Sequence, residues 1–343
     1  MDFKEFDAII DARTPSEYAL DHIPEAISAP VLSDAERAEV GTLYKQVSPF
    51  DAKKLGAALI AKNVASHIEQ LFKSHGKSWH PLVYCWRGGK RSGAMAHILR
   101  EVGWPAETLP GGYKAYRRWV VSQLEKIPGE LQFHVVHGPT GSGKSRFLQS
   151  LKAAGAQVLD LEALAAHRGS VLGDLPGQPQ PSQKFFESRL LREIDEMAKE
   201  KPTFVEGESK KIGDVQVPEA LMARMRASPC VRLEASLETR VALLLDEYRH
   251  FLRDPAALGA QLDCLVALHG RGKIAEWKAL AARGTWNELV ARLLAEHYDP
   301  AYRRSAARNF ARLPDARALR IDSPDDAAFL RAARSLLEEP VVA

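Results

Sequence analysis

The chain has 343 residues, more than one hydrophobic core usually covers, so two domains are expected. Its 45% hydrophobic and 27% charged residues are typical of a globular protein, and a formal net charge of +3 is too small to indicate nucleic-acid binding by itself. The three cysteines, Cys85, Cys230 and Cys264, lie far apart, which argues against a disulfide framework or a zinc site and favours a reducing compartment.

The first half of the chain alternates strand and helix patterns. Residues 7–11 (DAIID) and 81–85 (PLVYC) predict short buried strands, and residues 92–101 and 114–126 predict helices. The stretch between residues 34 and 76 is polar and prone to helix, and its apolar positions suit covering helices. This pattern predicts an α/β domain over residues 1–127, ended by the turn signal KIPGE.

A second alternating series follows. Strands are predicted at 131–137, near 156–160 and at 202–206, with helices beginning at Lys144 and Gln183. Another strand (PCVRLEAS), mostly helical sequence over 237–311, a strand at 319–322 and a last helix complete it. The series predicts a parallel-sheet nucleotide fold with a helical, arginine-rich C-terminal part, residues 131–343.

The N-terminal stretch MDFKEFDAIIDAR carries charges throughout and has no apolar leader. Uncharged apolar runs in the chain fall short of the length that spans a bilayer. A cytoplasmic location without a membrane partner is therefore expected.

The stretch VYCWRGGKRSG, residues 83–93, places a cysteine at the end of a strand, before basic residues and a helix expected to start at Ser92. Backbone N–H groups, the helix dipole and the charges of Arg87, Lys90 and Arg91 favour the thiolate, which is the nucleophilic form. Cys85 is therefore the candidate catalytic residue. Cys230 and Cys264 are expected to be buried and inert.

Three stretches together resemble the rhodanese domain: DARTPSEYALDHIPEAISAP (11–30), the cysteine loop and PGGYKAYRRW (110–119). The resemblance implies that Cys85 carries a persulfide or perselenide and that Asp11 and Arg13 are structural. Cys85 and Arg91 enclose five residues, where the usual sulfurtransferase loop encloses four, which resembles rhodanese-like phosphatases and predicts a bulkier anion. A phosphatase remains an alternative, although Tyr84 stands where those enzymes have histidine. The predicted anion loop comprises Trp86, Arg87, Gly88, Gly89, Lys90, Arg91 and Ser92.

The stretch HGPTGSGKSRF, residues 137–147, contains the G-x-x-x-x-G-K-S pattern of a P-loop between a strand and a helix. Its glycines let backbone N–H groups surround phosphate oxygens, Lys144 adds positive charge, and the Ser145 hydroxyl can ligate magnesium. The predicted diphosphate site comprises Gly138, Thr140, Gly141, Ser142, Gly143, Lys144 and Ser145.

Two further segments are candidates for the same site. The strand end PTFVEGES supplies Glu206 or Glu208 as an acidic group, and we select Glu206 with Ser145 as the candidate Mg²⁺ ligands, although a glutamate at a strand end is often merely solvated. Residues 167–182 form either a lid, with Arg168 and Ser170 touching the diphosphate, or a mobile connection.

Across nearly its whole length the chain resembles the tRNA 2-selenouridine synthase family, through both loops and through AHRGSVLGDLPGQPQPSQKFFES (166–188) and FVEGESKKIG (204–213). The resemblance implies a transferase acting on the wobble 2-thiouridine in the anticodon region of tRNA. Geranyl diphosphate first alkylates the sulfur, and selenophosphate then replaces the geranylthio group to give 2-selenouridine. It further implies Mg²⁺, no ATP requirement and contact with a selenophosphate-producing enzyme.

Residues 302–320 are rich in arginine and suit RNA phosphates and unstacked bases, although a solvated helix face is an equal alternative. Residues 113–119 form a second basic and aromatic patch whose aromatics are also candidates for the core. The predicted tRNA contacts are Arg303, Arg304, Arg308 and Arg312.

Two other functions stay open from the sequence. One is an ATP-dependent kinase with a fused sulfurtransferase domain, for which Cys85 would be irrelevant to phosphoryl transfer. The other is a redox-sensing RNA-binding module that retains tRNA without changing its nucleosides.

Overall fold

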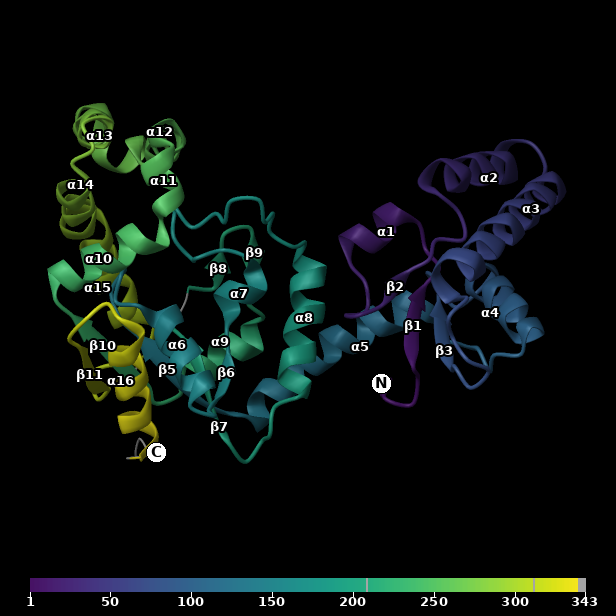
Figure 1. Cartoon of the computed structure of the whole chain (residues 1–343), viewed down its shortest axis with the longest axis horizontal. Helices are drawn as coiled ribbons and strands as arrows, with labels where there is room; N and C mark the ends of the chain where they lie inside the picture. Colours follow the sequence, from purple (N-terminus) through teal and green to yellow (C-terminus); the bar gives the residue numbers. More distant parts are fainter. Residues whose placement is uncertain (208, 311, 339–343) are drawn as a thin grey trace. The chain divides into compact units, whose positions relative to one another are not determined.

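The computed structural model describes residues 1–207, 209–310 and 312–338, with the backbone alone for residues 305–309 (Figure 1). The chain divides into two compact units. The cysteine unit contains Met1–Gln123 and Ser182–Arg192, and the P-loop unit contains Leu124–Pro181 and the chain from Glu193 on. Each unit has its own parallel sheet, so the predicted α/β fold class is confirmed.

The cysteine unit is built on a four-stranded parallel sheet in the order β2-β1-β3-β4. The central strands are buried, as expected for parallel strands covered on both faces. The strands are β1 (Ala8–Asp11), β2 (Ile27–Ser28), β3 (Pro81–Tyr84) and β4 (Glu107–Thr108). The helices are α1 (Pro15–Leu20), α2 (Asp34–Gln46), α3 (Pro49–His67), the π-helix η1 (Ile68–Phe72), α4 (Lys90–Val102), α5 (Gly112–Lys126) and α8 (Gln183–Asp195).

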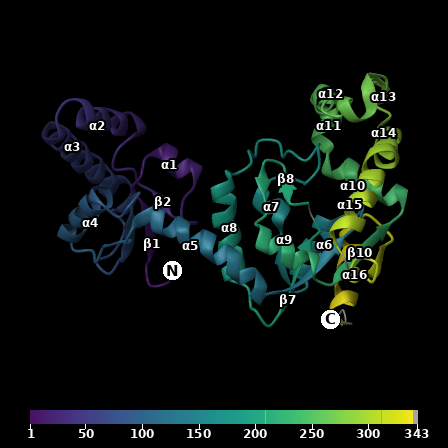
Figure 2. The same cartoon turned by 180° about the vertical axis from the view of Figure 1, so that it is seen from behind.

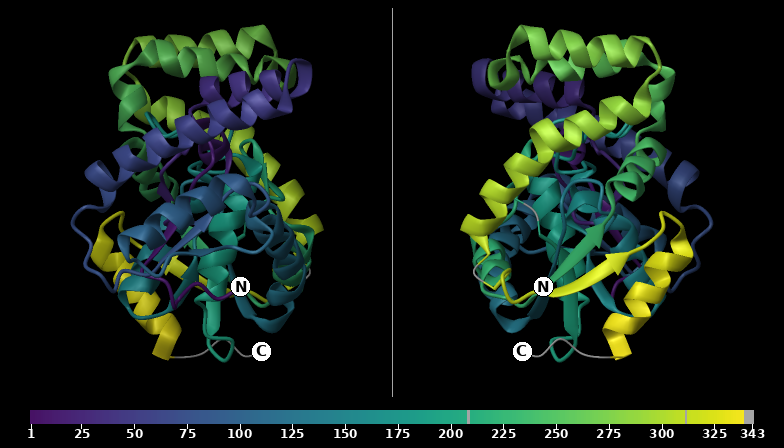
Figure 3. Two further views of the ribbon diagram at one scale, coloured as in Figure 1. Left: turned by 90° about the vertical axis from the view of Figure 1, so that its right-hand side faces the viewer. Right: turned by 90° about the vertical axis from the view of Figure 1, so that its left-hand side faces the viewer.

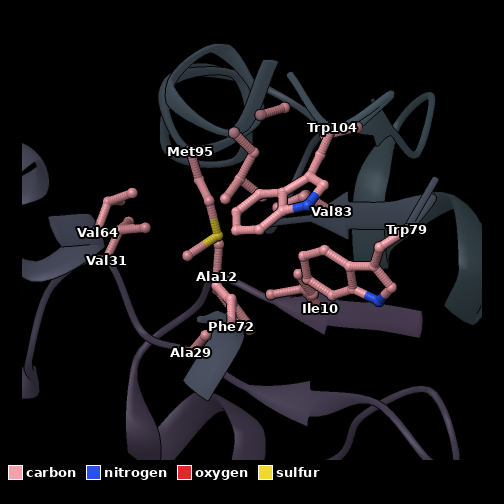
Figure 4. Packing of buried hydrophobic residues seen from close by; sticks show 13 residues of the cluster. Ile10, Ala12, Ala29, Val31, Val64, Phe72, Trp79, Val83, Met95 and Trp104 are labelled. Carbon is pink, nitrogen blue, oxygen red and sulfur yellow. The ribbon is translucent and has the colours of Figure 1, made fainter. Parts of the chain in front are cut away.

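The core of the cysteine unit forms around Met95 of α4. Figure 4 shows its side chain between Val31 and Val64 on one side and Trp79 and Trp104 on the other. The two indoles meet edge to face, with ring centroids 5.2 Å apart. This packing fixes α4 on the sheet, and the position of α4 in turn fixes the loop that follows Cys85.

The P-loop unit has a five-stranded parallel sheet in the order β11-β10-β5-β7-β6. The strand that precedes the P-loop is therefore central, which brings the loop to the carboxyl edge of the sheet between two neighbours. Figure 3 shows β10 and β11 running parallel. The strands are β5 (Gln132–His137), β6 (Gln157–Leu159), β7 (Pro202–Glu206), β10 (Cys230–Ala235) and β11 (Arg317–Ile321). A separate hairpin pairs β8 (Lys211–Ile212) with β9 (Val215–Gln216). The covering helices are the 3-10 helix η2 (Ile127–Glu130), α6 (Lys144–Ala153), α7 (Leu161–Ala165), α9 (Glu219–Arg226) and α16 (Asp326–Glu338).

The predicted helical extension lies between β10 and β11. Its middle helices, α11 to α14, lie together beyond one end of the five-stranded sheet (Figures 1 and 2). They have their own core around Trp277, Phe251 and Leu289. The elements are α10 (Leu237–Glu247), α11 (Arg249–Arg253), α12 (Pro255–Asp263), α13 (Val266–Ala282), α14 (Trp286–Leu293), the π-helix η3 (Leu294–Tyr298) and α15 (Asp299–Asn309).

Three features differ from the sequence-based expectation. Helix α4 begins at Lys90 instead of Ser92, because the Ser92 side chain bonds to a sulfur instead of capping the helix. Cys264 is exposed at the end of α12, because it follows the last buried residue of that helix, Leu262. Most of α8 groups with the cysteine unit, whereas the sequence assigned it to the second domain. Within the described residues, none of the helices combines the length and apolar character needed to cross a membrane.

Candidate functional site

The loop after β3 closes around the sulfur of Cys85. The backbone N–H of Gly89 and the hydroxyl of Ser92 donate to Sγ at 3.3 and 3.2 Å. Gly88 adopts a φ of 65°, and a Cβ there would approach the Leu109 carbonyl oxygen to 2.6 Å, so the turn requires glycine. Burial raises the pKa of the Cys85 thiol, but the hydrogen bonds from Ser92, Gly89 and Arg87 outweigh it and the net pKa is lowered. The arrangement therefore favours the thiolate.

The cations of this loop have different environments. Arg91 is held by Glu17 of α1, with 2.6 Å between Nη1 and Oε2. Burial raises the pKa of Glu17, but the hydrogen bond from Arg91 contributes to a net lowering, so the pair is ionised at neutral pH. Arg87 and Lys90 are exposed. Glu17 thus orients Arg91, while Arg87 and Lys90 present their charge to an incoming anion.

Asp11, Arg13 and Tyr84 form a buried network beneath the loop. Arg13 Nη2 lies 2.6 Å from Asp11 Oδ2, and the Tyr84 hydroxyl donates to the same oxygen at 2.7 Å. The Tyr84 hydroxyl also accepts from the backbone N–H of Ile23. These contacts give Tyr84 a role in holding the strands, which weighs against a catalytic role at the position that the phosphatases fill with histidine.

Cys85 opens into a wide hollow, here called the Cys85 hollow, of about 1950 Å³ including the solvent within it. The predicted anion-loop residues Trp86, Arg87, Gly89, Lys90 and Arg91 line it together with Cys85. Residues of α2 and α3 form its other wall, which the sequence did not indicate.

The P-loop connects β5 to α6 as predicted. Gly141 and Gly143 have φ values of 78° and 79°, which the loop needs in order to turn its N–H groups inward. A Cβ on Gly143 would lie 2.4 Å from Cζ of Phe329 in α16, so only glycine fits there. Lys144 is the first residue of α6, where the helix N-terminus adds positive potential.

Two glutamates lie close to Ser145 at the start of α6. The Ser145 hydroxyl donates to Glu162 Oε2 at 2.9 Å, and the backbone N–H of Glu162 donates to Glu206 Oε1 at 2.6 Å. Burial raises the pKa of Glu162, against the opposing charge of Lys144. The sequence analysis selected Glu206 and missed Glu162. The available signal was the position of Glu162 three residues after the end of strand β6, in the stretch LDLE. Glu208, the other acid considered, lies outside the described residues.

This group fits a magnesium ion. The side chains of Ser145, Glu162 and Glu206 supply oxygen atoms, the ligands that Mg²⁺ prefers, and Mg²⁺ commonly takes one or two carboxylates and completes its shell with phosphate and water. A zinc or calcium cage would instead be a cluster of three or more histidine, cysteine, aspartate or glutamate side chains, and the described residues contain no such cluster.

The structure brings Arg168 and Ser170 to the same region. Arg168 Nη1 donates to the Glu247 carbonyl at 2.7 Å, its guanidinium lies 4.7 Å from the Tyr248 ring centroid, and its charge acts on Glu162. Ser170 lies beside the hydroxyls of Tyr248 and Tyr298. The loop after α7 thus places a cation near the partner of Ser145.

An apolar pocket begins at Thr140 of the P-loop. Its free volume is about 60 Å³, within a hollow of about 560 Å³ that includes open solvent. Apart from Thr140 its lining is aliphatic and aromatic, contributed by the residue Leu172 and by α10, α11, α12, α14 and η3. The lining residues are Leu172, Leu244, Leu245, Tyr248, Phe251, Leu252, Leu258, Trp286, Leu289, Val290, Leu293, Leu294 and Tyr298.

The predicted tRNA contacts differ in their environments. Arg303 and Arg304 are exposed on α15, whereas Arg312 is half-buried near Cys230 and His134. The side chain of Arg308 lies outside the described residues. In the second patch Tyr113 and Tyr116 are buried in the cysteine unit, and Lys114, Arg117 and Arg118 line a pocket together with Trp86.

Comparison with known proteins identifies both halves of the chain. Residues 1–118 match the rhodanese-like domain, and residues 131–261 match the tRNA 2-selenouridine synthase AAA domain. A tRNA 2-selenouridine synthase from Sulfurovum sp. is 31% identical over 341 residues, which cover 89% of this chain and 90% of the relative. The chain belongs to the tRNA 2-selenouridine synthase family. The predicted family is thus confirmed.

Other members of the tRNA 2-selenouridine synthase family match over a shorter stretch. The protein of that name from Bdellovibrio bacteriovorus is 39% identical over 72% of this chain, and the one from Nitrosomonas europaea is 36% identical over 70%. These matches span 65% and 63% of the relatives' own lengths, slightly under two thirds.

Proposed function

We propose that this chain converts wobble 2-thiouridine in tRNA to 2-selenouridine by S-geranylation at the P-loop followed by selenation at Cys85. The name shared by its relatives supports the overall reaction. The observation that favours geranyl diphosphate as the first substrate is the apolar pocket that begins at Thr140.

A P-loop beside an apolar pocket suits a diphosphate with a hydrocarbon tail. The apolar lining matches a hydrocarbon tail, and because the free volume of the pocket is only about 60 Å³, the lining helices must move apart to admit ten carbons. A purine would need polar partners, whereas the side chains next to Thr140 are apolar. The pocket therefore weighs against the kinase alternative and agrees with the expectation that ATP is not required.

In the first step the thiocarbonyl sulfur attacks C1 of geranyl diphosphate, the C1–O bond breaks, diphosphate leaves and the N3 proton is released. Lys144, Arg168 and the N–H groups of the P-loop stabilise the charge that develops on the leaving diphosphate. Ser145, Glu162 and Glu206 would hold Mg²⁺, which neutralises part of the same charge. S-alkylation makes C2 more electrophilic and the sulfur a better leaving group.

In the second step selenium of selenophosphate attacks C2, and the C2–S bond breaks with departure of the geranylthiolate. The donors around Cys85 suit the phosphate group of this anion. The Cys85 thiolate is then placed to attack phosphorus and break the P–Se bond, and water releases the phosphoryl group as phosphate. The lowered pKa of Cys85 supports this nucleophilic role.

Mass spectrometry of digested tRNA tests the proposal. Wild-type chain given 2-thiouridine tRNA and geranyl diphosphate should yield the geranylated nucleoside, and added selenophosphate should yield 2-selenouridine. Lys144→Ala should abolish geranylation, and Cys85→Ser should stop 2-selenouridine formation while sparing geranylation. Intact geranylation by Lys144→Ala would show that the P-loop does not bind the diphosphate. tRNA retention without any nucleoside change would favour the binding-module alternative.

A further inference from the structure

Helices α2 and α3 form a hairpin (Figure 1), and one face of each helix lines the Cys85 hollow. The lining positions recur at helical spacing, so each helix presents a continuous stripe to the hollow. On α2 the stripe is Arg37, Val40, Gly41, Tyr44 and Lys45, and on α3 it is Ala52, Lys53, Gly56, Ala57 and Ile60.

The hairpin is held together mainly by close packing of its two helices. A Cβ on Gly56 would make an ordinary contact with Val40, at 3.4 Å, so the two helices lie side by side at this point without requiring glycine. Helix α2 has no buried residue and starts with a capping box at Ser33. Its inner face therefore lies over the hollow instead of over a core, which is unusual for a helix unless something occupies that space.

The charged side chains that line the Cys85 hollow are all positive. Six of its lining residues are basic and none of its described lining residues is acidic. Arg87, Lys90 and Arg91 belong to the loop around Cys85, and Arg91 is held by Glu17. The second group is Arg37, Lys45 and Lys53 on the hairpin, all exposed. A single tetrahedral anion needs only the first group and a small part of the free volume of about 970 Å³, which leaves the second group available to a larger polyanion.

Exposed aromatic side chains complete the hollow. Tyr44 and Trp86 are 52% and 39% exposed although both are large and apolar, and both line the hollow together with Leu32, Val40 and Ile60. Unpaired nucleobases stack on such surfaces, while paired bases in a duplex present only their edges. Cations beside aromatic rings and an apolar floor are the chemistry that binds single-stranded RNA.

We propose that the α2–α3 hairpin is an RNA-binding element: Arg37, Lys45 and Lys53 bind phosphates of an unpaired RNA loop, and Tyr44 and Trp86 stack its extruded base beside Cys85. This inference rests on the proposed function in taking the anticodon loop as the RNA. It adds a surface and a recognition mode that neither the motifs nor the arginines of α15 supply.

Binding of a synthetic anticodon stem-loop RNA to the full chain tests the proposal without any turnover. The probe carries 2-thiouridine at the wobble position, and fluorescence anisotropy gives Kd at several salt concentrations. Lys45→Glu with Lys53→Glu should weaken binding by at least about tenfold and lower the salt dependence, since each lost phosphate contact on a single strand removes about 0.7 from the slope. Tyr44→Ala should weaken binding of the loop without changing the slope.

A matched control is the pair Lys62→Glu and Lys73→Glu, which makes the same charge change at exposed positions that do not line the hollow. The control should bind within about twofold of wild type, because nonspecific charge effects are screened at physiological salt. Equal losses in both double variants would overturn the proposal. So would normal RNA binding by Lys45→Glu with Lys53→Glu accompanied by a higher KM for selenophosphate alone, which would assign the hairpin to the small anion.

Photocrosslinking locates the base directly. A stem-loop with 4-thiouridine at the wobble position should crosslink to peptides containing Tyr44 or Trp86, and crosslinks confined to other peptides would contradict the inference. Both measurements read binding. If the chain forms no modified nucleoside, the binding measurements still test the hairpin. If the hairpin does not bind RNA, the nucleoside assay still tests the proposed reaction.

Discussion

At the scale of single residues, the Cys85 loop shows how one hydroxyl sets the reactivity of a buried thiol. Ser92 is fully buried, and its hydroxyl donates to Cys85 Sγ at 3.2 Å. Burial alone would raise the pKa of the thiol, so the net lowering depends on donors that prefer the thiolate. Ser92 is the donor whose side chain can be removed without changing the backbone.

Ser92→Ala should raise the pKa of Cys85 relative to wild type, because the thiolate loses a donor. Only the thiolate reacts with iodoacetamide, and a raised pKa leaves less thiolate at neutral pH. Alkylation of Cys85 should therefore slow by about tenfold at neutral pH, since a hydrogen bond to a charged group contributes about 1.5–3 kcal/mol. The pH profile should shift to higher pH.

The alkylated position has to be assigned by peptide mass spectrometry, because Cys264 is exposed and also reacts. Cys264 serves as the internal control, whose pH profile Ser92→Ala should not change. An unchanged profile for Cys85 in this variant would mean that the backbone donors alone stabilise the thiolate.

At the scale of elements, the P-loop depends on a helix that the motif does not contain. Gly143 packs against Phe329 of α16, which lies nearly two hundred residues further along the chain and is fully buried. The loop conformation is thus supported by tertiary packing as well as by its own glycines.

Gly143→Ala should cost more free energy of unfolding than a positive φ alone explains. The left-handed conformation costs about 1–2 kcal/mol for alanine, and displacing Phe329 adds about 1–3 kcal/mol of overpacking. Gly155→Ala is the matched control, because Gly155 has a φ of 89° but no atom within 4 Å of the added Cβ. Urea unfolding should separate the two variants, and calorimetry should show diphosphate binding lost only in Gly143→Ala. Equal stability losses with binding intact would refute this account.

The apolar pocket gives a second prediction for the elements. Val290 on α14 lines the pocket, so Val290→Trp should fill space that a ten-carbon tail needs. The KM for geranyl diphosphate should rise about tenfold, while dimethylallyl diphosphate, which has five carbons, should be used about as well as by wild type. Leu268→Trp is the control, because Leu268 is 71% exposed on α13. A parallel loss for both diphosphates would mean that the tail does not lie along α14.

At the scale of the whole molecule, the cysteine unit is not one continuous stretch of the chain. Helix α8 follows residues 167–181 of the P-loop unit, yet most of it belongs to the cysteine unit. There the Ser188 hydroxyl donates to Asp21 Oδ1 at 2.9 Å, Tyr113 donates to Asp21 Oδ2 at 2.6 Å, and Arg117 pairs with Glu187. The chain thus crosses between the units just before α8 and again within its last turn.

A mixture of two inactive chains tests whether the two reactions are separable. Cys85→Ser supplies geranylated tRNA, and Lys144→Ala retains the Cys85 site. Because the S-alkylated nucleoside is a stable covalent product, we expect the mixture to form 2-selenouridine, as measured by mass spectrometry of the nucleosides. Neither variant alone should form it. No 2-selenouridine from the mixture, under conditions where wild type makes it, would show that the tRNA stays on one chain throughout.

The sequence by itself determined the features whose information is local. The P-loop, the cysteine loop and their strands are each encoded by consecutive residues, so β5 and β7 begin and end within a residue of the prediction, and α6 begins at the predicted Lys144. Cys85, Lys144 and Ser145 were identified because the chemistry of each motif requires those residue types at fixed spacing. The family followed from the same motifs.

Only the tertiary structure decided which distant residues meet. Glu162 joins Ser145, the apolar helices reach Thr140, and α8 joins Asp21 through contacts that bridge 17 residues in the first case and 167 in the last. The α2–α3 stripe gave only a weak pattern in the sequence, because its inner face lies over a hollow and does not need to be apolar. Local sequence patterns encode the geometry of a turn or a helix. Contacts between distant residues depend on how whole elements pack together, and the spacing of residues along the chain does not specify that packing.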